Sequence, residues 1–129
     1  MKKSEPVLQI PIYPLDQQFT SFAKYNDSKS DGKRITIQQL DLWFLQAEII
    51  DYKRVTHTDT GVYFNRFKQL SIDYKTFLIF LQMFCQEKDL DYEEIKDKLK
   101  GCGLPGFDKA VRLIVKAYVL YLAHKRLVN

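Results

Sequence analysis

The sequence predicts an all-α protein with about six helices. Apolar residues recur at helical spacing along most of the 129 residues, and helix-start signals precede these periodic segments. No β-rich region interrupts them beyond short extended pieces expected at Ile35, Val55 and Ile72. The 9 Phe, 8 Tyr and 1 Trp, against only 5 Gly and 4 Pro, exclude a wholly disordered or fibrous chain.

The N-terminal segment, residues 1–13, is expected to be an extended arm. Pro6, Pro11 and Pro14 each push the preceding residue away from helical geometry. Residues 14–129 are then predicted to form a single helical domain that ends in a long apolar and basic helix. The two cysteines are too few for a disulfide scaffold, which favours a reducing compartment.

The first two helices flank the turn-forming stretch NDSKSDGKR. The first is predicted from Leu15, because Leu15, Phe19 and Phe22 lie on one side of a helix. The second begins at Thr36, which forms a capping box with Gln39. Trp43 lies beside the apolar face of this second helix, so we expect it to be buried.

The next two helices follow the connector IIDYKRVTHTD. Thr56 or Thr58 is the expected N-cap of the third helix, in which Gly61 is unfavourable. Asp73 is the expected N-cap of the fourth, whose apolar face continues to Cys85.

Two further helices complete the chain. One runs from Asp91 to a stop at Gly101, and the last runs from near Asp108 to about Leu127. Within this last helix, LIVKAYVLYLA is apolar at almost every position, which covers the full circumference, and it is too short to cross a membrane. Either the helix packs centrally in the domain or a partner covers one of its faces.

The order helix, loop, isoleucine, helix occurs twice, with a glycine in the first loop, and is typical of an EF-hand pair. With Gly32 at the sixth loop position, Lys29 occupies a ligand position and Gln38 replaces the bidentate Glu at the end of the loop. In the second loop, Arg66 and Lys68 occupy the ligand region. We therefore expect an EF-hand-like helix-loop-helix pair with degenerate loops that hold no metal, plus additional C-terminal helices.

No motif predicts catalysis, and we expect neither an enzyme nor a cofactor site. The sequence contains no nucleophile elbow, no P-loop and no Cys–His–acid signature. His57, His124, Cys85 and Cys102 lack ligand-pair spacing, so a zinc site is not predicted from them, although their side chains could still converge.

Positive charge is concentrated in the second half of the chain. Residues 66–129 hold 12 basic and 8 acidic residues, and no acid follows Asp108. This distribution indicates an acidic partner, with an ordinary solvated helix face as the alternative. Nucleic acid is disfavoured because no basic-aromatic motif is present. The candidate partner-binding residues are Lys33, Arg34, Lys53, Arg54, Lys109, Arg112, Lys116, Lys125 and Arg126.

These segments resemble the tubulin polymerisation-promoting protein family. The matching features are listed here in chain order: Phe19, Phe22 and Ala23; Gly32 and Lys33; Trp43; Ile50, Asp51, Val55, Thr56, Thr58 and Asp59; Phe64 and Lys68; Ile72, Tyr74 and Phe77. The connector from Ile50 to Asp59 is the most specific of them.

The resemblance implies a cytoplasmic, cytoskeletal protein that binds tubulin and promotes or stabilises microtubule assembly. Other microtubule-associated proteins are possible further partners, and an ordered short member would suit a stable lattice such as a ciliary axoneme. Longer members carry a basic, Gly-rich C-terminal tail that this sequence lacks, so functions of that tail do not transfer. The alternative is a degenerate EF-hand adaptor that binds a non-tubulin partner through an aromatic groove.

We expect millimolar Ca²⁺ to leave the melting temperature unchanged. Lys29 and Gln38 occupy ligand positions, whereas a working site would raise the melting temperature by mass action. Differential scanning fluorimetry with and without Ca²⁺ checks this, with Mg²⁺ as the control. A rise specific to Ca²⁺ would contradict the assignment of degenerate loops.

Overall fold

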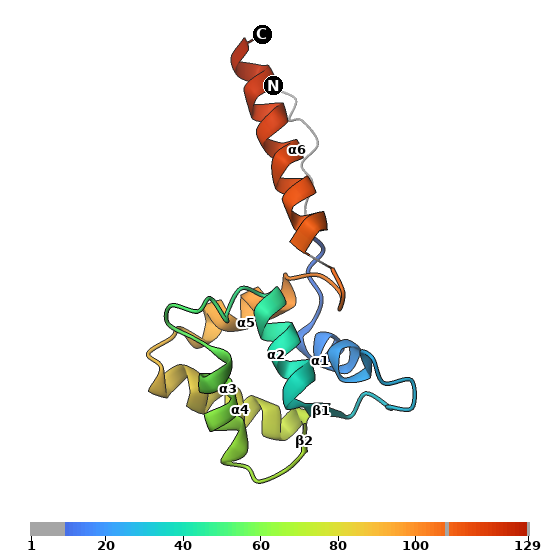
Figure 1. Ribbon diagram of the computed structural model, residues 1–129, viewed down its shortest axis with the longest axis vertical. Coiled ribbons are helices and arrows are strands. Elements are labelled where there is room, and N and C mark those ends of the chain that lie inside the picture. Colours follow the sequence, from blue (N-terminus) through green and yellow to red (C-terminus); the bar gives the residue numbers. More distant parts are fainter. Residues whose placement is uncertain (1–9, 108, 129) are drawn as a thin grey trace.

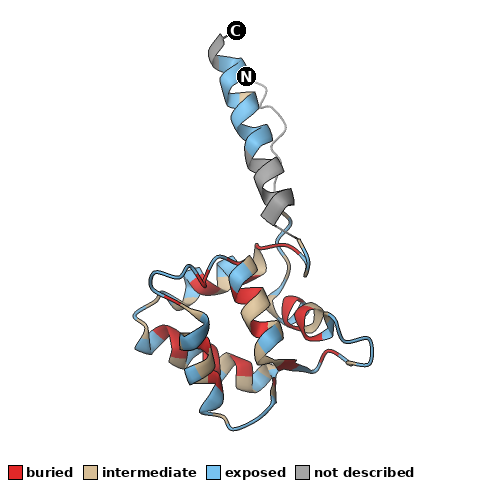
Figure 2. Cartoon of the chain, viewed as in Figure 1, coloured by how far each residue is buried: buried red, intermediate tan, exposed pale blue. Residues whose placement is uncertain are grey.

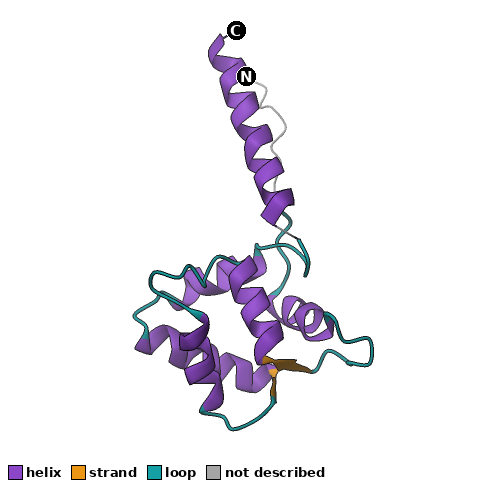
Figure 3. Cartoon of the chain, viewed as in Figure 1, coloured by secondary structure: helices purple, strands orange, loops and turns teal. Residues whose placement is uncertain are grey.

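The computed structural model describes residues 10–107 and 109–128, and in the last helix it describes the side chains of residues 117–126. The described chain forms six helices and two short strands, which confirms the predicted helical class (Figures 1 and 3). In chain order they are α1 (Leu15–Lys24), β1 (Arg34–Thr36), α2 (Ile37–Gln46), α3 (His57–Asn65), β2 (Ser71–Asp73), α4 (Tyr74–Glu87), α5 (Tyr92–Lys100) and α6 (Lys109–Val128).

Side-chain caps fix where the helices begin. The hydroxyl of Thr36 accepts a hydrogen bond from the backbone N–H of Gln39, whose side chain accepts one from the Thr36 N–H in return. Thr56 and Asp59 form the same reciprocal pair at α3, so Thr56, and not Thr58, is the N-cap. Because each box satisfies two N–H groups that have no partner within the helix, these starts are legible in sequence.

Three local features come from the structure. Helix α3 ends at Asn65, because a turn follows it and leads into β2. Val55, one of the three expected extended pieces, lies in a loop and belongs to neither strand. Cys102 is only 2% exposed, because its turn packs against α1 and α2.

A two-stranded antiparallel sheet joins the two helix–loop–helix segments. Ile35 of β1 pairs with Ile72 of β2, and both side chains are fully buried. The preceding loop turns at Gly32, which has a positive φ of 78°. A Cβ there would approach Cγ2 of Thr20 to 2.6 Å, so α1 packs tightly against this turn and requires glycine.

The core of helices α1–α5 is built around Trp43. Its indole lies between Phe22 of α1 and Phe77 of α4, with near-parallel rings whose centroids are 5.2 Å away on each side. Its Nε1 donates a hydrogen bond to the carbonyl oxygen of Leu99 on α5, at 3.1 Å. The expected burial of Trp43 is confirmed, and one side chain contacts the three neighbouring helices.

Helix α6 extends away from the body formed by α1–α5 (Figure 1). Every described side chain from residue 117 to 126 is exposed except Leu122, which is partly buried (Figure 2). Central packing of this apolar stretch, one of the two alternatives from the sequence, is therefore wrong for these residues.

Replacing Trp43 with alanine should lower the free energy of unfolding by about 3–5 kcal/mol, because it leaves a large cavity between the flanking rings. Trp43→Phe is the matched variant: it keeps an aromatic ring there and loses the hydrogen bond to Leu99, so its loss should be smaller. Urea denaturation monitored by circular dichroism measures both. Equal stability of the alanine variant and the wild type would contradict this account of the core.

Candidate protein interface

The predicted basic residues do not form one patch on the body. Lys33 and Arg34 lie at β1, before α2, whereas Lys53 and Arg54 lie in the connector after α2. The ten residues of α2 separate the two pairs by about 15 Å of helix. Lys125 and Arg126 lie on α6, beyond the body (Figure 1). The candidates thus occupy three separate regions.

Arg34 is held in place by the opposite strand. Its guanidinium donates hydrogen bonds to Oγ and the carbonyl oxygen of Ser71, at 2.9 and 2.5 Å, and to Oε1 of Gln69, at 2.8 Å. The side chain therefore fastens the loop before β2 to β1. Lys33, which is exposed beside it, has no such side-chain contact among the described residues and can reach a partner.

Arg54 faces an acidic hollow. Its guanidinium donates a hydrogen bond to the carbonyl oxygen of Asp89 at 2.9 Å. The hollow has a volume of about 290 Å³ and is lined by five acidic residues and two basic ones: Glu48, Asp51, Asp89, Asp91 and Glu94, with Arg54 and Lys98. These carboxylates repel an acidic partner, so the surroundings of Arg54 favour it less than those of Lys33.

The connector before α3 is shaped by Asp51. One carboxylate oxygen accepts hydrogen bonds from the backbone N–H groups of Lys53, Arg54 and Val55, at 2.9, 2.9 and 3.2 Å. These bonds stabilise the charged form and lower the pKa of Asp51 to about 2. Together with the Thr56 cap, they give most of the connector motif a structural role.

Helix α6 carries the remaining candidates. Lys125 and Arg126 are exposed on its last turns, next to an exposed His124. The side chains of Lys109, Arg112 and Lys116 lie outside the described residues, so their predicted basic ridge stays a prediction. The sequence of α6 contains no acidic residue, so the helix as a whole is cationic.

A second hollow lies between α1 and the start of α4. It has a volume of about 640 Å³ and is lined by the partly buried Tyr74 and the buried Phe19, whose rings meet edge-to-face at 5.3 Å. Two basic and two acidic residues also line it: Lys33, Lys75, Asp16 and Asp73. The combination of an aromatic surface and mixed charge could hold a polar peptide segment.

Two glutamines that the sequence analysis overlooked hold the turn before α6. The buried amide of Gln18 donates to the carbonyl oxygens of Leu99 and Gly103, at 3.1 and 2.9 Å. The side-chain amide of Gln46 donates to the carbonyl oxygens of Cys102 and Leu104, at 2.9 and 2.8 Å. Gln18 lies on the apolar side of α1 between Leu15 and Phe22. A polar residue on an apolar helix face indicates a buried hydrogen-bonding role, and this pattern was visible in the sequence.

The possible zinc ligands do not converge among the described residues, where no group of three His, Cys, Asp or Glu side chains has metal-binding geometry. His57 instead contacts Asp41, with Nδ1 3.4 Å from Oδ2, and Thr60 donates to the same carboxylate. Burial outweighs these contacts and raises the pKa of Asp41. Burial likewise raises the pKa of the Cys85 thiol to about 11, which disfavours the thiolate that zinc requires.

The carboxyl group of Asp51 should titrate with a midpoint near 2, below its ordinary value of 3.8. A lowered pKa means that its stabilising contribution is present above the unfolded-state pKa and is lost as the pH falls toward 2. Asp51→Asn should therefore melt below wild type at neutral pH, and the difference should narrow in acid. NMR titration and pH-dependent melting measure this, and a midpoint near 4 would contradict it.

The family of the chain follows from comparison with known proteins. A family model described as p25-alpha matches residues 16–120, a span that includes both helix–loop–helix segments, α5 and the first part of α6. A search of curated proteins found no match. No helix in the described part of the chain is long and apolar enough to cross a membrane. The chain belongs to the p25-alpha family, that of the tubulin polymerisation-promoting proteins.

Proposed function

We propose that this protein is a non-enzymatic, microtubule-associated protein that binds tubulin and promotes or stabilises microtubule assembly. The observation that carries the proposal is membership of the p25-alpha family over most of the chain. The exposed, acid-free helix α6 supports it, because a cationic and apolar element suits an acidic protein surface. The protein would act on the cytoplasmic cytoskeleton, including stable lattices such as an axoneme, with other microtubule-associated proteins as neighbours.

The fold that presents this helix is proposed to be EF-hand-like and to form one domain over residues 14–129. The antiparallel pairing of Ile35 with Ile72 between two helix–loop–helix segments supports that assignment. The loop oxygens already have partners: Asp27 and Asp31 accept hydrogen bonds from the backbone N–H groups of Lys29 and Lys33. The first loop is thus held by its own hydrogen bonds, which suits a protein that works without calcium.

Co-sedimentation with microtubules at rising KCl concentration tests the proposal. Wild type should pellet with microtubules, and its affinity should fall as salt screens the attraction. Reversal of the predicted ridge (Lys109, Arg112 and Lys116, each to Glu) should lower the affinity by about tenfold or more, because charges at an interface govern encounter with an acidic partner.

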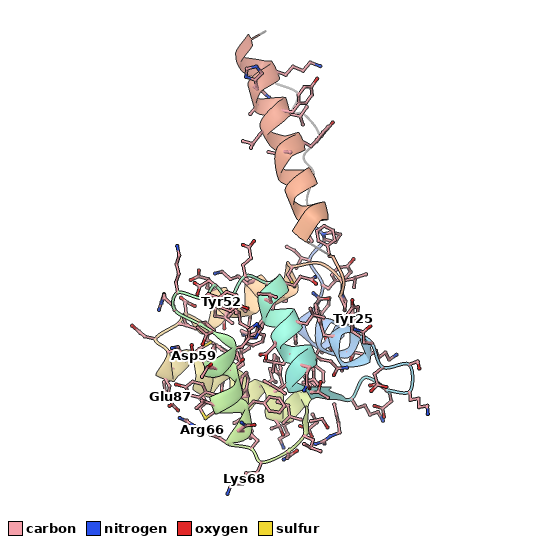
Figure 4. The ribbon with its side chains drawn as sticks, in the orientation of Figure 1. Tyr25, Tyr52, Asp59, Arg66, Lys68 and Glu87 are labelled. Atoms are coloured by element: carbon pink, nitrogen blue, oxygen red, sulfur yellow. The ribbon has the colours of Figure 1, made fainter. Side chains whose placement is uncertain are left out.

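A control variant separates a local effect from net charge. Lys29, Lys68 and Lys98, each to Glu, produce the same change in charge on exposed parts of the body, and Lys68 lies at the end opposite α6 (Figure 4). This control should bind more tightly than the ridge variant, and both should melt close to wild type. If the ridge variant binds like wild type, the basic ridge of α6 is not part of the tubulin-binding surface. Lys33–Arg34 and then Lys53–Arg54 become the next candidates.

The second candidate function is an adaptor for a non-tubulin partner. The hollow beside Phe19 and Tyr74 favours it, since aromatic surface and opposite charges meet there. Absence of microtubule binding by wild type, together with a peptide ligand lost in Tyr74→Ala, would favour the adaptor over the microtubule-associated protein.

A further inference from the structure

Helix α6 presents two opposite apolar faces within about one helical turn, residues 118–121. Tyr118 and Tyr121 are about 60° apart around the axis and form an aromatic face, with ring centroids 6.4 Å apart. Val119 and Leu120 lie on the other side and form an aliphatic face, centred about 180° from the aromatic one. All four side chains are substantially exposed, at 43% and 57% for the tyrosines and 40% and 69% for the aliphatic residues.

Such a helix differs from an ordinary surface helix, which has one apolar face and one polar face. A groove on a single protein surface covers one side of a bound helix and leaves the opposite side in water. Contact through the aromatic face alone would leave Val119 and Leu120 exposed, and contact through the aliphatic face would leave both tyrosines exposed. Burial of both faces therefore requires two surfaces.

The positive charge of α6 limits which kinds of surface can cover it. The sequence of α6 has no acidic residue, and Lys125 and Arg126 follow the apolar stretch. If a second copy packed its own α6 against this one, basic side chains would meet with no carboxylate on either helix to pair with them. A lipid surface would cover one side of a helix lying flat on it, and the helix is unsuited to crossing a membrane. A partner with acidic groups around apolar surface complements both features.

We infer that α6 is enclosed on both faces by an acidic partner assembly, with the aromatic face on one partner surface and the aliphatic face on another. This inference rests on the proposed function, which makes tubulin the partner; the two surfaces then belong to neighbouring tubulin dimers. Such a helix joins two dimers and does not only attach to one. It would bind assembled microtubules in preference to free tubulin dimers, because the junction between dimers exists only in the lattice.

Two double variants test the two faces separately in the full-length protein. Tyr118→Ala/Tyr121→Ala removes the aromatic face, and Val119→Ala/Leu120→Ala removes the aliphatic face; alanine preserves helix propensity. The matched control is Val62→Ala/Ile79→Ala on α3 and α4, where each side chain is 52% exposed. Circular dichroism and melting verify that all three variants fold.

Each α6 variant should lose about tenfold or more in microtubule affinity by co-sedimentation, and the control should stay within about twofold of wild type. Loss in only one α6 variant would overturn the two-sided inference in favour of a single groove. Loss in neither, with wild type still binding, would overturn it and leave the proposed function intact. Failure of wild type to bind microtubules would overturn both.

Two further measurements test the alternatives to tubulin, a second copy of this chain and a lipid surface. Light scattering after gel filtration should give a monomer, and a dimer that both α6 variants dissociate would overturn the inference in favour of a second copy. Sedimentation with phosphatidylserine vesicles should leave the protein in the supernatant, and pelleting abolished by the same variants would overturn it in favour of a lipid surface. Equal affinity for free tubulin dimers and microtubules would also contradict a junction site.

Discussion

The packing of Trp43 between Phe22 and Phe77 is the interaction on which the rest of the body depends. A flat indole held on both faces fixes the separation of α1 and α4 as well as their position against α2. Its N–H then binds the Leu99 carbonyl at the end of α5. One side chain thereby joins four helices, α1, α2, α4 and α5, and the two-stranded sheet joins the loops.

The backbone carbonyl of Leu99 also links the core to the turn that follows α5. The carbonyl oxygen of Leu99 also accepts a hydrogen bond from the buried side-chain amide of Gln18, and the same amide donates to the carbonyl oxygen of Gly103. The side-chain amide of Gln46 donates to the carbonyl oxygen of Cys102 in the same turn. The body therefore holds residues 102–104 of the turn that follows α5 through three backbone carbonyl oxygens.

Charge is separated along the molecule in a way that fits an acidic partner. The hollow around Arg54 contains more carboxylates than cations, whereas the α6 sequence contains cations and no carboxylate. The proposed acidic partner would therefore be repelled from one side of the body and attracted to the helix, which would orient the protein before short-range contacts form. In the proposed complex, the exposed side chains of Tyr118, Val119, Leu120 and Tyr121 would supply apolar surface for burial against the partner.

Most of the fold was predictable because its signals are local. Helical periodicity and the caps at Thr36, Asp73 and Asp91 act within a few residues, so the sequence displays them directly. The connector motif is legible for the same reason, since Asp51 and Thr56 bind their own neighbours in the chain. The extended pieces at Ile35 and Ile72 were expected from the sequence, but their antiparallel pairing is a finding of the tertiary structure.

The candidate site was less predictable, because exposure and proximity depend on contacts between distant segments. Composition identified the basic residues, but only the tertiary structure tied Arg34 to Ser71, placed Arg54 among carboxylates and left Lys33 accessible. The sequence alone determined that α6 is apolar around its circumference and free of acid. Only the tertiary structure decided that no face of residues 117–121 is buried, because burial is set by which elements pack together and not by the hydrophobicity of a helix.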